Sequence, residues 1–499
     1  MKSDKNPELQ LATEFVRDTG CNIFLTGKAG TGKTTFLHEL KKDSPKRMVV
    51  TAPTGVAAIN AGGVTLHSFF QMPFGPFIPG SENSRQHRFN REKINIIKSL
   101  DLLVIDEISM VRADLLDGVD SVLRKYRRST RPFGGVQLLL IGDLHQLSPV
   151  VKDADWRLLG PHYDSPYFFS SNSLRQTELI SIELQHIYRQ ADSHFIDLLN
   201  HVRDNRLTPE TLLSLNTRHL ENFHDKEEKG YITLCTHNRN ADTINALKLK
   251  TLSSTMHHFE AEIEGDFPEH SYPTADVLQL KVGAQVMFMR NDSSYEKRYF
   301  NGKIGKLTRI SGDQLFIQCP EDVEEIMVEP ATWENIEYSL NHESQEITEN
   351  KIGAFVQYPL KLAWAITIHK SQGLTFDRAI IDAQASFAHG QVYVALSRCR
   401  TLEGMVLSAP ITARSVKTDR TVLQFVAQAV KNCPTQEQLA TAKIRYQHQL
   451  LLDCFDFHRL QNLLSRFIST VTGNAEIIQL SGIEDISGLQ QNTVNEICT

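Results

Sequence analysis

The sequence predicts an α/β fold made of two tandem cores, each built on parallel strands. Three observations lead to this prediction: a Gly-rich loop between an apolar run and a helical pattern, short apolar runs that end in acidic or polar residues, and a second series of such runs after residue 180. At 499 residues the chain has room for about three domains of ~150 residues. Apolar residues make up 41% and charged residues 22%, which is typical of a globular protein.

The Gly-rich loop is the most specific local pattern in the chain. Residues 27–35 read GKAGTGKTT and lie between the apolar run 21–25 and the helical pattern 36–40. This matches G-x-x-x-x-G-K-[ST], in which backbone N–H groups at a helix N-terminus surround the phosphates of a nucleotide. We therefore expect Lys33 at the β and γ phosphates of a nucleoside triphosphate and the Thr34 hydroxyl on Mg²⁺. The nucleotide-binding residues predicted from the loop are Gly30, Thr31, Gly32, Lys33, Thr34 and Thr35.

Two apolar runs downstream end in residues suited to phosphate chemistry. The run 102–105 is followed by Asp106 and Glu107. An acidic pair at a strand end predicts Asp106 as a ligand of Mg²⁺ and Glu107 as the group that polarises the attacking water. The run 137–141 leads to Gln146, whose amide we expect to bond the γ-phosphate.

Residues from 180 onward resemble a second α/β unit that has no Gly-rich phosphate loop. Its predicted strands and helix are 232–235, 239–250, 378–382 and 405–407. Arg189 and Arg398 lie in this half. We expect their guanidinium groups to close over the γ-phosphate, a contribution worth about 10³–10⁵ in rate. A surface ion pair is the alternative for either arginine taken alone.

Composition excludes several other classes of protein. No run of about eighteen apolar residues is present, so no membrane span is predicted. The first seven residues lack the features of a signal peptide or presequence, so we expect an intracellular protein, in the cytoplasm or nucleoid of a bacterium, or in a nucleus or mitochondrion. Seven scattered cysteines without a C-x-x-C pair predict reduced thiols and no structural zinc. A net charge of −6 argues against a protein that coats nucleic acid electrostatically and leaves room for a local groove that holds one strand.

Six short motifs occur in the order found in superfamily 1 helicases. They are GKAGTGKT, DEIS, GDLHQL, IYRQ, IHKSQGLTF and YVALSRCR. Residues 101–150 most resemble the Pif helicases (petite integration frequency, superfamily 1 clade B), whose signature segment is similar to residues 113–135. The resemblance, which covers about residues 8–410, implies two RecA-like cores that use ATP and Mg²⁺. It also implies 5′→3′ movement on single-stranded DNA and unwinding of duplexes, single-strand/duplex junctions and G-quadruplexes, in replication, repair and recombination. A monomer is expected, with a dimer on DNA as an alternative.

The resemblance assigns roles to further residues. Gln10 stands where the family has an adenine-reading glutamine, and Gly373 joins the nucleotide-binding set. Polar turns in both halves look like the two DNA grips of the family, where small residues, hydroxyls and loop N–H groups can meet phosphates. The DNA-contacting residues so assigned are Pro53, Thr54, Gly55, His67, Thr236, His237, Asn238, Thr367, His369, Lys370 and Ser371. For His67, packing in the core is the alternative.

Composition and resemblance together set the expected domain limits. These are a first RecA-like core 1–180 with an inserted element 66–92, a second core 181–260 and 351–417, a small inserted β-barrel 261–350, and a helical C-terminal extension 418–499. The inserted element 66–92 is either a wedge that meets the duplex or a surface loop. The extension either packs on the motor or serves as an arm for protein partners.

Two other interpretations of the function stay open at this point. A RecD-like motor subunit of a recombination nuclease would share most motifs, although the segment 113–135 favours Pif. A DNA-binding ATPase switch that is not a motor would hydrolyse ATP without separating strands.

Overall fold

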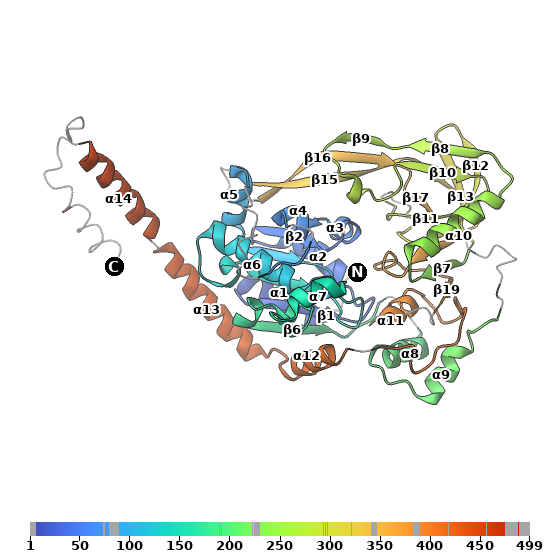
Figure 1. Ribbon diagram of the computed structural model, residues 1–499, viewed down its shortest axis with the longest axis horizontal. Helices are drawn as coiled ribbons and strands as arrows, with labels where there is room; N and C mark the ends of the chain where they lie inside the picture. Colours follow the sequence, from blue (N-terminus) through green and yellow to red (C-terminus); the bar gives the residue numbers. More distant parts are fainter. Residues whose placement is uncertain are drawn as a thin grey trace. The chain divides into compact units, whose positions relative to one another are not determined.

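The computed structural model describes residues 6–72, 75–78, 89–188, 190, 192–221, 223, 230–292, 294, 296, 298–320, 322–340, 347–382, 390–417, 419–455, 457–474 and 488. The chain divides into two compact units. The first comprises Met1–Arg17 and Cys21–Pro434, and the second comprises Asp18–Gly20 and Thr435–Thr499. All six motifs lie in the first unit (Figure 1).

The first core is a six-stranded, all-parallel sheet with the strand order β3-β2-β4-β5-β1-β6. Its strands are β1 (Asn22–Gly27), β2 (Met48–Ala52), β3 (Val64–Thr65), β4 (Leu102–Ile105), β5 (Gln137–Ile141) and β6 (Leu179–Leu184). Its helices are α1 (Pro7–Asp18), α2 (Lys33–Asp43), α3 (Gly55–Ala61), α4 (Leu66–Phe70), α5 (Arg91–Ser99), α6 (Ala113–Arg127) and α7 (Asp153–Leu159). Every residue of β4 and β5 is buried, as expected for central strands of a parallel sheet. The predicted core boundary at residue 180 falls inside β6, which pairs with β1 along its whole length.

Helix α6 carries three buried aspartates whose carboxylates are all hydrogen-bonded. Asp114 accepts from the backbone N–H of Phe77 (2.8 Å), and Asp120 accepts from the backbone N–H of Phe133 (2.5 Å). Asp117 accepts from the Tyr163 hydroxyl at 3.0 Å. Buried carboxylates are tolerated only when they are paired in this way. The segment 113–135 therefore has a structural role in tying loops to the first core.

The second core is a four-stranded parallel sheet with the order β18-β7-β19-β20. Its strands are β7 (Ile232–Cys235), β18 (Ala365–Thr367), β19 (Ala379–Ile381) and β20 (Met405–Leu407), and its helices are α8 (Ser193–Arg203), α9 (Pro209–Asn216), α10 (Asn238–Thr251) and α11 (Gln391–Leu396). Ala29 and Leu147 of the first core belong to the same apolar cluster as Phe195 and Leu234 of the second. The two cores thus pack directly against each other.

A β-rich insert separates β7 and α10 from the rest of the second core. Its strands are β8 (Met256–Glu260), β9 (Glu262–Gly265), β10 (Val277–Lys281), β11 (Gln285–Phe288), β12 (Ile304–Ser311), β13 (Gln314–Gln318), β14 (Ile326–Val328), β15 (Ala331–Leu340), β16 (Ile347–Gln357) and β17 (Leu360–Leu362). Among the described residues they form antiparallel sheets β14-β13-β12-β11-β17, β10-β8 and β15-β16-β9. The insert extends beyond the predicted limits 261–350, because β8 precedes residue 261 and β16 runs past residue 350. Strand β15 reaches α5 of the first core, where Ile336 packs on its apolar cluster (Figure 1).

Part of the predicted C-terminal extension belongs structurally to the first unit. Helix α12 (Arg420–Lys431) buries Val422 in the apolar cluster of the first core, and the Phe425 ring stacks on Phe169 with centroids 4.3 Å apart. In the second unit, α13 (Gln436–Cys454) begins with a capping box formed by Thr435 and Gln438, and α14 (His458–Gly473) follows. Nowhere in the described part of the chain does a helix combine the length and apolar character needed to cross a bilayer.

Candidate nucleotide site and DNA-facing turns

The phosphate loop connects β1 to α2. Gly30 and Gly32 adopt left-handed backbone conformations (φ 83° and 87°), which glycine adopts without steric cost. The Lys33 ammonium donates to the carbonyl oxygens of Gly27 (2.7 Å) and Lys28 (2.9 Å), at the centre of the loop. Burial lowers the pKa of Lys33, while the carboxylate of Asp143 acts in the opposite direction. The loop therefore presents one buried cation and the N-terminal amides of α2 to the same place.

A cleft of about 730 Å³ lies over this loop, between the two cores. It contains most of the residues predicted to bind or cleave the nucleotide, namely Gly30, Thr31, Gly32, Lys33, Thr34, Thr35, Glu107, Gln146, Gly373 and Arg398. Gln10 is not among the described residues that line the cleft; it is exposed on α1, where its amide donates to Glu14 (3.1 Å). The structure thus brings the motifs of both halves to one cavity.

Two carboxylates stand at the end of β4, beside the cleft. Asp106 is buried, accepts the backbone N–H of Glu107 (2.9 Å), and has its pKa raised to about 6 by burial. Glu107 has a left-handed backbone (φ 51°), and burial together with the neighbouring Asp106 raises its pKa to about 7. Its Oε2 accepts a hydrogen bond from Nε2 of Gln372 in the second core, at 2.7 Å.

The donor chemistry near the loop fits magnesium. Thr34 offers a hydroxyl oxygen and Asp106 a carboxylate oxygen, and Mg²⁺ is typically held by one or two such groups together with waters and substrate phosphates. Within the described ranges, no cluster of three or more His, Cys, Asp or Glu side chains could hold a metal ion by itself. The residues present therefore suit a magnesium ion that binds together with a nucleotide.

The second core contributes a buried arginine to the cleft. The Arg398 guanidinium donates to the Val394 carbonyl (3.0 Å) and to the Ser397 hydroxyl (3.0 Å). Its positive charge acts on Glu107, where it opposes the rise in pKa. Arg189, the other predicted arginine, lies outside the described residues. Of its neighbours, Tyr188 donates its backbone N–H to the Gly30 carbonyl (2.8 Å).

Three close contacts join the two cores around the cleft. The Ala29 N–H of the phosphate loop donates to Oη of Tyr393 (3.2 Å). Gly390 lies against Gln146, since a Cβ at Gly390 would stand 2.0 Å from the Gln146 carbonyl oxygen. Arg203 forms a buried ion pair with Asp143 (3.3 Å). Burial alone would raise the pKa of Asp143, but the Arg203 guanidinium lowers this pKa to about 2.

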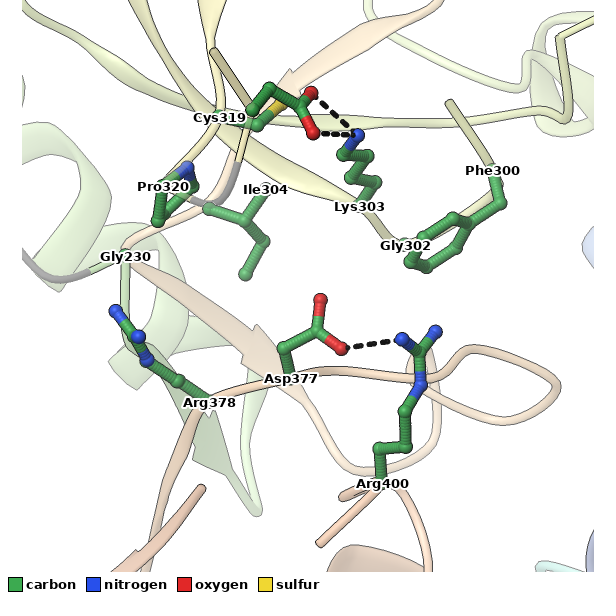
Figure 2. A pocket seen from close by; sticks show the side chains of 11 residues that line it. Gly230, Phe300, Gly302, Lys303, Ile304, Cys319, Pro320, Asp377, Arg378 and Arg400 are labelled. Carbon is green, nitrogen blue, oxygen red and sulfur yellow. Dashed lines mark hydrogen bonds and ion pairs between the residues drawn. The ribbon is translucent and has the colours of Figure 1, made fainter. Parts of the chain in front are cut away.

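The insert also contributes to the wall of the cleft. Asn291, Phe300 and Asn301 line it. Phe300 and Arg400 line a second cavity of about 210 Å³ between the insert and the second core as well (Figure 2). In that cavity Asp377 pairs with Arg400 (3.0 Å), and Lys303 pairs with a carboxylate of the insert (2.6 Å). The insert and the second core therefore both contribute to the wall of the nucleotide cleft.

Sequence reasoning missed several of these residues. Tyr188, Gln372 and Tyr393 lie inside the recognised motifs, so their motif position was an available signal. Arg203 and the insert residues Asn291, Phe300 and Asn301 carry no local pattern, because only the folded chain brings them to the cleft.

The predicted DNA-contacting residues of the first core follow β2 and β3, at the start of α3 and within α4. Thr54 caps α3, with its Oγ1 accepting the Ala57 N–H at 3.2 Å. Pro53, Gly55 and His67 line a cavity of about 510 Å³ that residues of β15 also line. His67 is partly buried, and burial lowers its pKa, so it is mainly a neutral donor and acceptor near neutral pH.

The matching residues of the second core follow β7 and β18. These strands are parallel neighbours, so their carboxyl ends share one edge of the sheet. His237, Asn238 and Lys370 are exposed there, and His369 is partly buried. Thr236, Thr367 and Ser371 are buried; the Ser371 hydroxyl donates to the Ile368 carbonyl (2.7 Å), and Thr367 Oγ1 accepts the Lys370 N–H (3.3 Å). The buried side chains hold the turn in shape, and the exposed ones face outward.

The element predicted at 66–92 is anchored at both sides of its central part. Residues 73–74 and 79–88 lie outside the described residues. Met72 and Phe89 belong to the apolar cluster of the first core, and the Phe89 ring lies 4.8 Å from that of Tyr126. The role of the element as a wedge stays a prediction.

A P-loop core that faces a second parallel core across one cleft defines the class of two-core RecA-like proteins. Residues 7–211 match the family model described as PIF1-like helicase, and residues 438–499 match a model described as DNA helicase, middle domain. The chain is 32% identical over 433 residues to the ATP-dependent DNA helicase Pif1 of Bdellovibrio bacteriovorus, covering 85% of this chain and 92% of that one. The chain belongs to the PIF1-like helicase family.

Other comparisons agree with this membership. The chain is 37% identical over 426 residues to the rat ATP-dependent DNA helicase PIF1, of which it spans 62% of the length, against 82% of its own. A crystal structure of a Bacteroides Pif1 with ADP-AlF4 matches with a TM-score of 0.79 at 42% identity, over 85% of this chain and 96% of that one. A structure of Bacteroides Pif1 bound to single-stranded DNA matches with a TM-score of 0.62 at 42% identity, over 86% and 97%.

Proposed function

We propose that this chain is an ATP-dependent DNA helicase that moves 5′→3′ on single-stranded DNA and unwinds duplexes. The observation that carries the proposal is the single cleft lined by the phosphate loop, Glu107, Gln146 and Arg398. Relatives named ATP-dependent DNA helicase over most of the chain support it. The direction of movement rests on family membership.

The residues of the cleft suit hydrolysis of ATP. Glu107 accepts a proton from the attacking water while the water oxygen bonds the γ-phosphorus and the bond to the ADP oxygen breaks. Magnesium, held by Thr34 and Asp106, would offset charge on the phosphates. Lys33 and Arg398 stabilise the charge on the transferring group, and Gln146 reports the presence of the γ-phosphate.

Movement follows if both cores hold one DNA strand. The segments that follow β2 and β3 supply the proposed contacts Thr54 and His67 in the first core, and those that follow β7 and β18 supply His237 and Lys370 in the second. The structure of Bacteroides Pif1 bound to single-stranded DNA supports this class of partner. Closure on ATP and release after hydrolysis then advance the strand. Splitting one base-pair step costs a mean of ~1.4 kcal/mol, a modest load for one ATP.

The finer assignments are also proposals. They are action at single-strand/duplex junctions and on G-quadruplexes, a monomeric motor, protein partners through the C-terminal helices, and an intracellular location where DNA is maintained. Family membership supports the DNA structures, and the match of residues 438–499 to a helicase domain model favours a role for these helices within the helicase.

A tailed-duplex assay tests the proposed function. We expect unwinding of a 5′-tailed duplex with ATP and Mg²⁺, and none with Lys33→Ala, which removes the cation of the phosphate loop. Unwinding of a 3′-tailed duplex alone would contradict the proposed direction. ATP hydrolysis without strand separation on either substrate would instead indicate a switch that is not a motor.

A further inference from the structure

Gln372 lies in the tight turn that follows β18. The backbone of this turn is closed by hydrogen bonds from Ser371 N–H to the Thr367 carbonyl (2.9 Å), from Gln372 N–H to the His369 carbonyl (3.3 Å), and from Leu374 N–H to the Ser371 carbonyl (3.0 Å). The turn therefore fixes the direction in which the side chain of Gln372 leaves the second core. Nearby residues of the turn have other proposed tasks. Lys370, which is exposed, is a proposed DNA contact, and Gly373 lines the nucleotide cleft.

The side chain of Gln372 reaches the other core. Its Nε2 donates to Oε2 of Glu107 at 2.7 Å, at the short end of the range for an N–H···O bond. Glu107 itself has a left-handed backbone conformation just after β4, and its side chain has several rotatable bonds. A general base must hold its reacting oxygen close to the proton that it removes, and a displacement of about 1 Å can cost about 10²-fold in rate. A partner that fixes the carboxylate is therefore worth a large factor.

We propose that Gln372 is a positioning residue for ATP hydrolysis, which fixes Oε2 of Glu107 so that Oε1 faces the attacking water. The proposal rests on the proposed function of the cleft. The base belongs to the first core and its positioning partner to the second, so the base is aligned only while the cores are closed. A neutral amide suits this task, because it orients a carboxylate without adding a cation beside Lys33 and Arg398.

Steady-state kinetics on the full chain separates positioning from a merely structural bridge. With saturating single-stranded oligonucleotide and Mg²⁺, Gln372→Ala should lower kcat about 10- to 100-fold while the KM and Kd for ATP stay within about threefold of the wild type. Gln372→Glu, which keeps the size but loses the donor, should lose at least as much. Gln314→Ala is the matched control, because the Gln314 amide also faces a glutamate, Glu329 (3.4 Å), but on the insert. Its kcat should equal that of the wild type.

A double-mutant cycle shows whether Gln372 acts through Glu107. In a Glu107→Ala background, Gln372→Ala should change the residual single-turnover rate less than about twofold, because its target is gone. If the rate losses of the two single variants multiply in the double variant, the inference is overturned. A kcat of Gln372→Glu within about threefold of the wild type would also overturn it. A wild-type chain that does not hydrolyse ATP would refute the proposed function instead, so the two failures are distinguishable.

Discussion

The two cores share a parallel sheet but present opposite chemistry to the cleft between them. The first core supplies the phosphate loop and the acids, with Lys33 as its buried cation and Glu107 as its proposed base. The second core has no phosphate loop and presents donors, the Arg398 guanidinium and the Gln372 amide. Neither core alone holds the whole set, so the proposed hydrolysis of ATP at this cleft requires both cores.

The cores also differ in how their polar groups are secured. In the first core the Glu107 carboxylate accepts its hydrogen bond from the other core, from Nε2 of Gln372 (2.7 Å). In the second core the Arg398 guanidinium donates to carbonyls of its own core, those of Val394 in α11 and of Leu374. The Arg398 guanidinium is thus held within its own core, whereas the Glu107 carboxylate is held across the cleft.

The largest effect is expected from removing the arginine of the second core. Arg398→Ala should lower kcat about 10³–10⁵-fold, because an arginine that stabilises the transferring phosphoryl group is worth that factor. The Kd for ATP should change little, since the phosphate loop is intact. A loss of nucleotide affinity with unchanged turnover, measured by equilibrium binding and by single-turnover hydrolysis, would make Arg398 structural.

The next effect is expected from the base of the first core. Glu107→Gln should lower hydrolysis about 10²–10⁴-fold, because an amide does not accept the proton of the attacking water. Binding of ATP and of single-stranded DNA should be retained. Hydrolysis above roughly one tenth of the wild-type rate would contradict the assignment.

The ion pair between Arg203 and Asp143, which joins the two cores, leads to a prediction about the free energy of unfolding. Arg203→Leu should lower the free energy of unfolding by about 3–5 kcal/mol, because it removes the ion-pair partner of the buried Asp143 carboxylate. Lys351→Ala breaks an exposed pair with Glu334 (3.7 Å) and should cost no more than about 1 kcal/mol. Urea denaturation measures both, and equal losses would contradict the distinction between the two pairs.

The same ion pair has a defined pH dependence. The folded pKa of Asp143 is about 2, below the value of about 3.9 for an unfolded chain. Its contribution is therefore fully present above about pH 4 and is lost as the pH falls toward 2. Between about pH 4 and pH 2, unfolding of the wild type should depend more steeply on pH than that of Asp143→Asn, in the same denaturation experiment.

The smallest effect concerns an element that the first core has and the second lacks. Deletion of residues 79–88 should reduce strand separation severalfold while the DNA-stimulated ATPase stays within about twofold. This deletion keeps Met72 and Phe89, which pack in the apolar cluster of the first core. Equal losses of unwinding and hydrolysis would argue against a wedge.

Local patterns sufficed to predict much of the fold and of the site. The phosphate loop, the acids after β4 and Gln146 each follow a buried strand, so their places beside the cleft could be predicted from neighbouring residues. Contacts between segments that are distant in the sequence could not be predicted in this way. The ion pair of Arg203 with Asp143 joins residues 60 positions apart, and the bond of Gln372 to Glu107 joins residues 265 positions apart. Likewise, α12 could not be assigned to the first core from its own periodicity, because the apolar cluster it completes lies elsewhere in the chain.

A crystal structure with ADP–aluminium fluoride and a short single-stranded oligonucleotide tests the central claim most directly. If both cores act on one nucleotide, the Arg398 guanidinium will lie within hydrogen-bond distance of the fluoride group that stands for the γ-phosphate, opposite Lys33. A guanidinium that points into bulk solvent in that fully liganded state would contradict the account.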